Sequence, residues 1–150
     1  MTVLLVVHHT VSPPMAEMLE AVLAGARDPD IEGVDVRVRP ALGATIADVV
    51  DADGILLGTP ANFGYMSGAL KHFLDTVYYP TLGSMNGKPW GAWVYGNNDT
   101  AGAVRALTSI VSGWGLEPAA VPVEVTGFDA AARERLVELG GTVAATIMPA

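Results

Sequence analysis

Residues 54–75 read GILLGTPANFGYMSGALKHFLD, and this stretch has the pattern of a buried strand, a loop and a helix in succession. Ile55–Leu57 is a short apolar run, as expected for a strand that is covered on both faces. Apolar residues recur at helical spacing over Leu70–Val77, and Ser67 is placed to cap that helix. The stretch therefore predicts one strand–loop–helix unit whose loop is Thr59–Met66.

The same alternation of strand and helix runs through the rest of the chain. Val3–Val7 is a continuous apolar strand, and helical spacing after two prolines predicts a helix over Pro13–Ala26. Further strands are expected at Val34–Val38, Pro89–Tyr95 and Val121–Val125. Further helices are expected from Thr45 to Val50, from Asp99 or Thr100 to Trp114, and from Asp129 to Ile147. The polar second strand and the strand that Pro122 interrupts are expected near the edges of the sheet.

This alternation predicts an α/β fold with a parallel sheet and helices on both of its faces. Five strands in the order 2-1-3-4-5, within a single domain of residues 1–150, fit the pattern. In such sheets ligands bind outside the carboxyl ends of the strands, at the switch point between the first and third strands. Three loops are expected at that edge: His8–Pro14, Thr59–Met66 and Gly96–Thr100.

The composition limits the classes of function that the chain can serve. Apolar residues make up 51% of the 150 residues and charged residues 16%, which is a globular composition. The net charge of −8 disfavours nucleic acid as a partner, and no apolar run is long enough to predict a membrane span. No cysteine is present, no histidine has metal-ligand spacing, and no secretion signal is recognised. We therefore expect a cytoplasmic protein without a metal site.

The segment Gly58–Asp75 closely resembles the second flavin-binding segment of flavodoxin-like NAD(P)H:quinone reductases and related flavin reductases. The match runs nearly residue for residue through the loop and into the helix. The resemblance implies membership of the flavodoxin-like superfamily, whose fold is a three-layer sandwich. It also implies FMN as the cofactor, NAD(P)H as a transient electron donor, and a quinone or another small molecule as the acceptor. A homodimer is the expected assembly.

The resemblance also assigns residues to the flavin site. The second loop would face the isoalloxazine ring and comprises Thr59, Pro60, Ala61, Asn62, Phe63, Gly64, Tyr65 and Met66. The third loop would cover the flavin edge with Gly96, Asn97 and Asn98, although an ordinary turn that caps the next helix explains these residues equally well. No side chain is expected to act as a catalytic acid or base, since the flavin carries the redox chemistry.

The first loop occupies the place of the phosphate loop of a flavodoxin. Its expected cofactor-binding residues are His9, Thr10, Ser12, Pro13 and Met15, with the hydroxyl groups of Thr10 and Ser12 holding the phosphate. A packed or solvated strand end is the alternative interpretation of His8 and His9. The loop departs from the family pattern because the usual glycine is absent and two prolines remove amide donors.

Three functions fit the sequence. The first is an FMN-dependent oxidoreductase that passes electrons from NAD(P)H to a quinone or another acceptor. The second is a flavodoxin-type electron carrier that acts with protein partners. The third is a non-redox binding module, which the atypical phosphate loop suggests. Direct oxidation of NAD(P)H separates the first function from the second, and FMN affinity separates both from the third.

Overall fold

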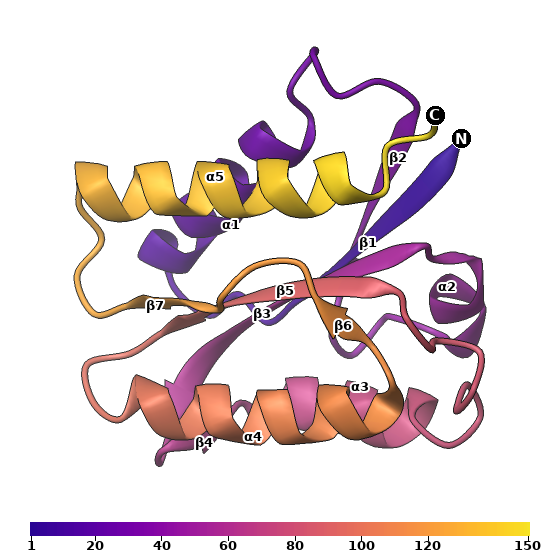
Figure 1. Cartoon of the computed structure of the whole chain (residues 1–150). Coiled ribbons are helices and arrows are strands. Elements are labelled where there is room, and N and C mark those ends of the chain that lie inside the picture. The colour runs from indigo at the N-terminus through magenta and orange to yellow at the C-terminus, as the bar shows by residue number, and fades with distance from the viewer.

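The computed structural model describes all 150 residues as one twisted sheet between two layers of helices (Figure 1). The strands are β1 (Thr2–His8), β2 (Val34–Pro40), β3 (Gly54–Asn62), β4 (Tyr65–Met66), β5 (Pro89–Tyr95), β6 (Glu117–Pro118) and β7 (Val123–Val125). The helices are α1 (Pro13–Ala26), α2 (Ile46–Asp51), α3 (Gly68–Val77), α4 (Thr100–Trp114) and α5 (Ala130–Thr146). The predicted α/β architecture with a parallel sheet is therefore present.

The strand count and order differ from the five-strand prediction. The seven-stranded sheet follows the path β2-β1-β3-β5-β6. Two strands lie off this path, since β4 pairs with β3 and β7 pairs with β5. One added strand is β4, which folds back antiparallel on the end of β3. The other is β6, which pairs with the start of β5, whereas the last predicted strand, Val121–Val125, begins only at Val123 as β7 and pairs with the end of β5. Pro122 lies outside both short strands, since proline cannot donate a ladder hydrogen bond.

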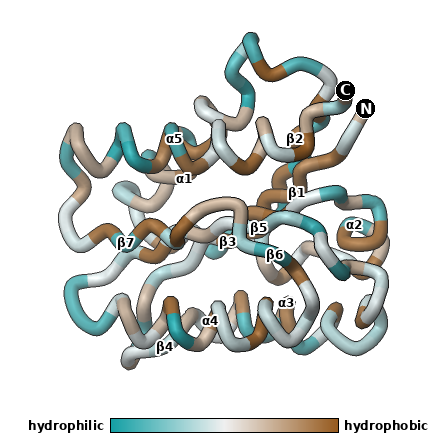
Figure 2. Tube along the Cα trace, in the orientation of Figure 1, coloured by the Kyte–Doolittle hydropathy of each residue, from teal (hydrophilic) through white to brown (hydrophobic).

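Two apolar clusters hold the layers together, one on each face of the sheet. In β1, Leu5 and Val7 belong to the cluster under α2, α3 and α4, whereas Leu4 and Val6 belong to the cluster under α1 and α5. This division follows from the alternation of side chains along a strand. Figure 2 shows hydrophobic residues gathered along the central strands, while the helices alternate between hydrophobic and hydrophilic positions. Burial on both faces explains why the central strands read as continuous apolar runs.

Predicted helix caps are present at four helices. Thr45 and Asp48 form a reciprocal capping box at α2, and Ser67 accepts from the amide of Leu70 at α3. Asp99 and Asp129 accept from main-chain amides in the first turns of α4 and α5. These caps fix where each helix begins, and therefore where each preceding loop ends. No helix combines the length and hydrophobicity that a membrane crossing requires.

Candidate functional site

The three predicted loops follow β1, β3 and β5, which are adjacent and parallel in the sheet. Their carboxyl ends therefore lie at one edge, on the left in Figure 1, where the chain passes from β5 into α4. The amide of His9 donates to the carbonyl of Gly58 at 2.9 Å, which ties the first loop to β3. The predicted neighbourhood of the first and second loops is thus built from the main chain.

The first loop contains two buried polar atoms without a hydrogen-bond partner, Nδ1 of His9 and Oγ of Ser12. Ser12 is the N-cap residue of α1, but its hydroxyl makes no capping bond. The hydroxyl of Thr10 is instead paired with Nδ1 of His8 at 2.8 Å. Buried polar atoms in folded proteins nearly always have partners, so two buried atoms without a partner in one loop indicate a place for a ligand. The two atoms available for a ligand are therefore on His9 and Ser12.

His8 lies on the α1 and α5 side of the sheet, and its pKa is shifted. Burial, and then the neighbouring charge of His9, lower the pKa of His8 below its ordinary value. His8 lines a cavity of about 530 Å³ together with residues of α1, Phe128 and Arg133 of α5. This cavity is on the α1 and α5 side of the sheet. His8 is therefore kept neutral more readily than an ordinary histidine, and it faces away from the α2–α4 layer.

The second loop is a β-hairpin rather than an open loop, because β3 continues to Asn62. Ala61 pairs with Met66 and Asn62 pairs with Tyr65, which leaves Phe63 and Gly64 as a two-residue turn. Both turn residues have positive φ, 53° and 70°, which is the geometry of a type I′ turn. Glycine adopts this geometry freely, whereas phenylalanine does so only at a cost in conformational energy.

Buried hydrogen bonds brace the base of this hairpin. The hydroxyl of Thr59 donates to the carbonyl of Pro60 at 2.8 Å and accepts from the amide of Ser67 at 2.9 Å. Thr59 is completely buried, so its hydroxyl serves the protein rather than a ligand. The side chains of Met15 and Met66 are also buried, at 1% and 2% exposure. Of these three predicted site residues, only main-chain atoms can meet a ligand.

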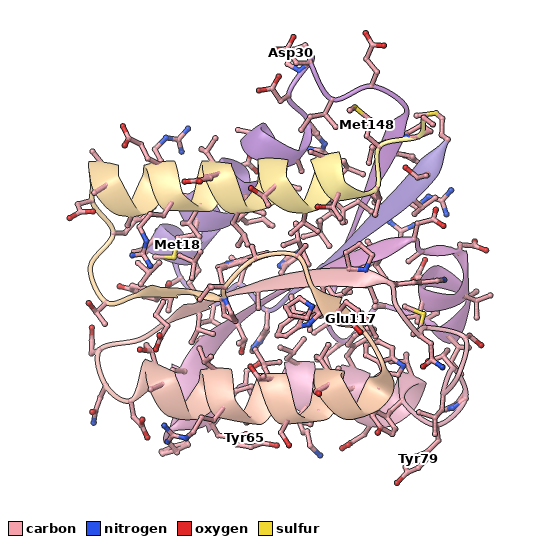
Figure 3. All side chains as sticks on the ribbon, viewed as in Figure 1. Met18, Asp30, Tyr65, Tyr79, Glu117 and Met148 are labelled. Atoms are coloured by element: carbon pink, nitrogen blue, oxygen red, sulfur yellow. The ribbon has the colours of Figure 1, made fainter.

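The tip of the hairpin presents aromatic side chains to solvent. Phe63 is 107% exposed relative to its reference state and Tyr65 is 39% exposed. Tyr65 lies along the outer side of α4, on the opposite side of the sheet from Met18 (Figure 3). An exposed aromatic residue held in a strained turn is an unusual combination, and such outliers concentrate at functional sites. The tip is thus a candidate platform for a flat ring.

The third loop contacts the hairpin directly. A Cβ atom at Gly64 would lie 2.5 Å from Oδ2 of Asp99, and one at Gly96 would lie 2.9 Å from Cβ of Ala61. Asp99 itself has a positive φ of 50° and caps α4. Asn97 and Asn98 are exposed between these two contacts. The second and third loops therefore form one packed wall, and Asp99 caps α4 as the turn and capping interpretation predicted.

Two features of the structure have no signal in the local sequence. The contact between Gly64 and the cap residue Asp99 joins positions that are far apart in the chain, and no periodic pattern reports it. The largest surface cavity, about 620 Å³, was also unexpected. It lies between the end of α4 and the β6 edge, over Trp90, and contains none of the predicted site residues. Glu117, at its rim, is visible in front of the sheet in Figure 3.

Comparison with known proteins places this architecture in a family. The model for the family described as NADPH-dependent FMN reductase matches residues 7–131. A flavodoxin from Aquifex aeolicus is 36% identical over 99 residues, covering 62% of this chain and 52% of the relative. An NAD(P)H dehydrogenase (quinone) from Methylocella silvestris is 30% identical over 131 residues, covering 75% of this chain and 65% of the relative. The chain thus spans only about half to two thirds of these relatives.

Solved structures agree on the fold. A flavodoxin from Streptococcus pneumoniae TIGR4 superposes with a TM-score of 0.82 at 21% identity, covering 97% of this chain and all of that structure (100%). A WrbA-like flavodoxin from Agrobacterium tumefaciens superposes with a TM-score of 0.79 at 20% identity, covering 99% and 100%. The fold is therefore flavodoxin-like. Because the family model matches well over half of the chain, this protein belongs to the NADPH-dependent FMN reductase family.

Proposed function

We propose that the chain binds FMN across the three loops and works as an oxidoreductase that passes electrons from NAD(P)H to a quinone or another acceptor. The observation that carries the proposal is the unpaired, buried Nδ1 of His9 and Oγ of Ser12 at the start of α1. In a flavodoxin-like sheet this is the position at which a phosphate would meet the protein. The family match supports FMN as the group that brings this phosphate.

The residues present fit the cofactor at both of its ends. A phosphate needs hydrogen-bond donors, and the Ser12 hydroxyl and the His9 imidazole are donors that the protein itself leaves unused. A flat ring needs an apolar wall with nearby amides, and the exposed Phe63 and Tyr65 stand at such a wall. Exposed Asn97 and Asn98 add side-chain amides along it. The chemistry that bound FMN supplies is electron transfer between a nicotinamide and an acceptor.

The protein's own contribution is to position and shield rather than to move protons. Beside the loops, burial lowers the pKa of His8, and a hydrogen bond to Asp75 raises the pKa of Lys71. The hairpin is fixed at its base by Thr59 and at its tip by Asp99, so the wall is rigid. A rigid wall suits a cofactor whose reactivity depends on orientation. The curated quinone dehydrogenase among the relatives supports a quinone as the acceptor.

A flavodoxin-type electron carrier is the second candidate. It is favoured by the relative from Aquifex aeolicus, which carries the name flavodoxin and has 36% identity. The exposed aromatic tip would then meet a protein partner as well as the ring. The non-redox module is the third candidate, and Pro13 and Pro14 at the start of α1 are the observation behind it. A homodimer would agree with any of the three.

Flavin titration followed by reduction separates these functions. We expect added FMN to lose fluorescence saturably as it binds the purified protein. We further expect anaerobic NADPH or NADH to bleach the bound flavin, and a soluble benzoquinone to restore its absorbance. Binding without bleaching would favour the carrier. Absence of binding at high FMN concentration would contradict both redox functions and leave the binding module.

A further inference from the structure

The first turn of α1 is poor in the donors that helix termini usually offer to anions. Pro13 and Pro14 occupy the first two helical positions and have no N–H group. The amide of Ala16 is already bonded to the carbonyl of Ser12 at 3.1 Å. An anion site built on a helix N-terminus depends on free amides in this turn. In this protein most of that donor capacity must come from side chains.

The first loop has two side-chain groups that are free to donate to a phosphate, and a third that is already hydrogen-bonded. Nδ1 of His9 and Oγ of Ser12 are buried and unpaired, whereas the Thr10 hydroxyl is occupied by His8. His9 differs from Ser12 because its ring can also carry a positive charge. A charged donor to a phosphate makes a shorter and stronger hydrogen bond than a neutral one. Of the two free groups, His9 is therefore the one able to offset the missing amides.

The other charged groups around the first loop are paired elsewhere or lie on the other face of the sheet, so His9 is the group available to bind a phosphate. Arg39, next to the end of β1 in the sheet, is paired with Asp48 of α2. The carboxylate of Asp99 from α4 accepts from the Gly102 amide, and that of Glu124 from β7 accepts from Thr100. Charged residues of α1 and α5 line the cavity beside His8 on the other face of the sheet, and these are Glu17, Glu20 and Arg133. No carboxylate forms an ion pair with His9 in the structure.

We infer that His9 takes the place of the missing helix amides, binding the FMN phosphate as a protonated imidazole and thereby selecting FMN over riboflavin. This inference rests on the proposed function, because it assigns a role within that same site. FMN binding then draws a proton from solvent onto the His9 ring, and the phosphate dianion balances the charge. Riboflavin has no phosphate, so its binding involves no such proton. The neutral state favoured for His8 keeps this proton uptake on one ring.

The test compares FMN with riboflavin in the wild type, in His9→Asn and in His8→Asn. His8→Asn is a matched control, because it makes the same change one residue earlier, at a ring that lines the cavity beside α1 and α5. Calorimetric titrations at about pH 8, where a phosphate monoester is a dianion, are run in two buffers of different ionisation enthalpy. The difference between the buffers gives the protons taken up on binding. A histidine in water is largely neutral at that pH, so a protonated His9 in the complex would be detected as a net uptake of protons on FMN binding.

We expect His9→Asn to lower the preference for FMN over riboflavin by about tenfold and to abolish the proton uptake. His8→Asn should keep the proton uptake, and its preference for FMN should not fall, because loss of the His8 ring also frees the Thr10 hydroxyl. Unchanged riboflavin affinity in His9→Asn would show that the site is still folded. If His9→Asn retained the full preference and the proton uptake, the inference would be overturned while the flavin site stood. If the wild type bound neither flavin, the proposed function would fall as well.

Discussion

The Gly140→Ala variant is expected to lose about 3 kcal/mol of its free energy of unfolding, the upper part of the usual range for overpacking. Gly140 lies in α5 where that helix crosses α1, and a Cβ atom there would lie 2.0 Å from the carbonyl oxygen of Val22. That oxygen belongs to the helix backbone and cannot rotate away. The two helices must therefore separate, which disrupts the apolar cluster they share with the sheet. Urea unfolding followed by far-ultraviolet circular dichroism measures the loss.

Gly141→Ala is the matched control for this prediction. It makes the same change in the next residue of the same helix, where a Cβ atom would lie 3.5 Å from the carbonyl oxygen of Gly25, an ordinary contact. Alanine is a better helix former than glycine by about 1 kcal/mol, so this variant should match or exceed the wild type in stability. Equal losses in the two variants would show that the close approach of α1 and α5 is not what requires glycine at position 140.

The Gly102→Ala variant is expected to weaken FMN binding by at least about tenfold, because small displacements of positioning groups have large effects on a preorganised site. Gly102 lies in the first turn of α4, and a Cβ atom there would lie 2.2 Å from the carbonyl oxygen of Gly64 in the hairpin turn. It would also lie 2.8 Å from Oδ2 of Asp99. The turn that presents Phe63 must therefore move away from α4. Fluorescence titration with FMN measures the change in affinity.

Gly68→Ala provides the control for the hairpin. Gly68 is the first residue of α3, just beyond the same hairpin, and a Cβ atom there meets nothing within 4 Å. This variant should bind FMN as the wild type does. The urea midpoint of both variants is recorded alongside, so that a local effect on the site can be told from global unfolding. Wild-type affinity in a folded Gly102→Ala protein would mean that the hairpin tip takes no part in flavin binding.

Periodicity predicted those elements whose signals are local. The apolar run Val3–Val7 lies within β1, and the predicted helix over Pro13–Ala26 matches α1 residue for residue. Capping by Ser67 and Asp129 was predictable because a cap depends on residues within one turn. The polar sequence of β2 correctly indicated an edge, since its Asp35, Arg37 and Arg39 would be costly in a central strand.

Features that depend on distant partners were missed. The extension of β3 to Asn62 requires pairing with Tyr65 and Met66, whereas the predicted strand ended at Leu57 together with the local apolar run. The separate strand β6 exists only because β5 lies beside it. Neither partner is visible in a local window of sequence.

The candidate site shows the same division at the level of single atoms. Its three loops were placed by topology alone, because the carboxyl ends of neighbouring parallel strands share an edge. Thr10 and Ser12 have similar chemistry, so the sequence does not indicate which of their two hydroxyl groups is free. The structure separates them through the bond between Thr10 and His8. In the same way, donation to the carbonyl of Pro60 removes the Thr59 hydroxyl from the available donors.

Binding of FMN across the three loops is tested most directly by a two-dimensional amide NMR titration of the isotope-labelled protein with FMN. We expect the largest shifts in the three loops, at His9–Ser12, Asn62–Tyr65 and Gly96–Asp99. Shifts centred instead on the groove around Trp90 and residues 116–122 would contradict FMN binding at the loops, because that groove, of about 620 Å³, lies apart from them. A spectrum that FMN leaves unchanged at saturating concentration would contradict it as well.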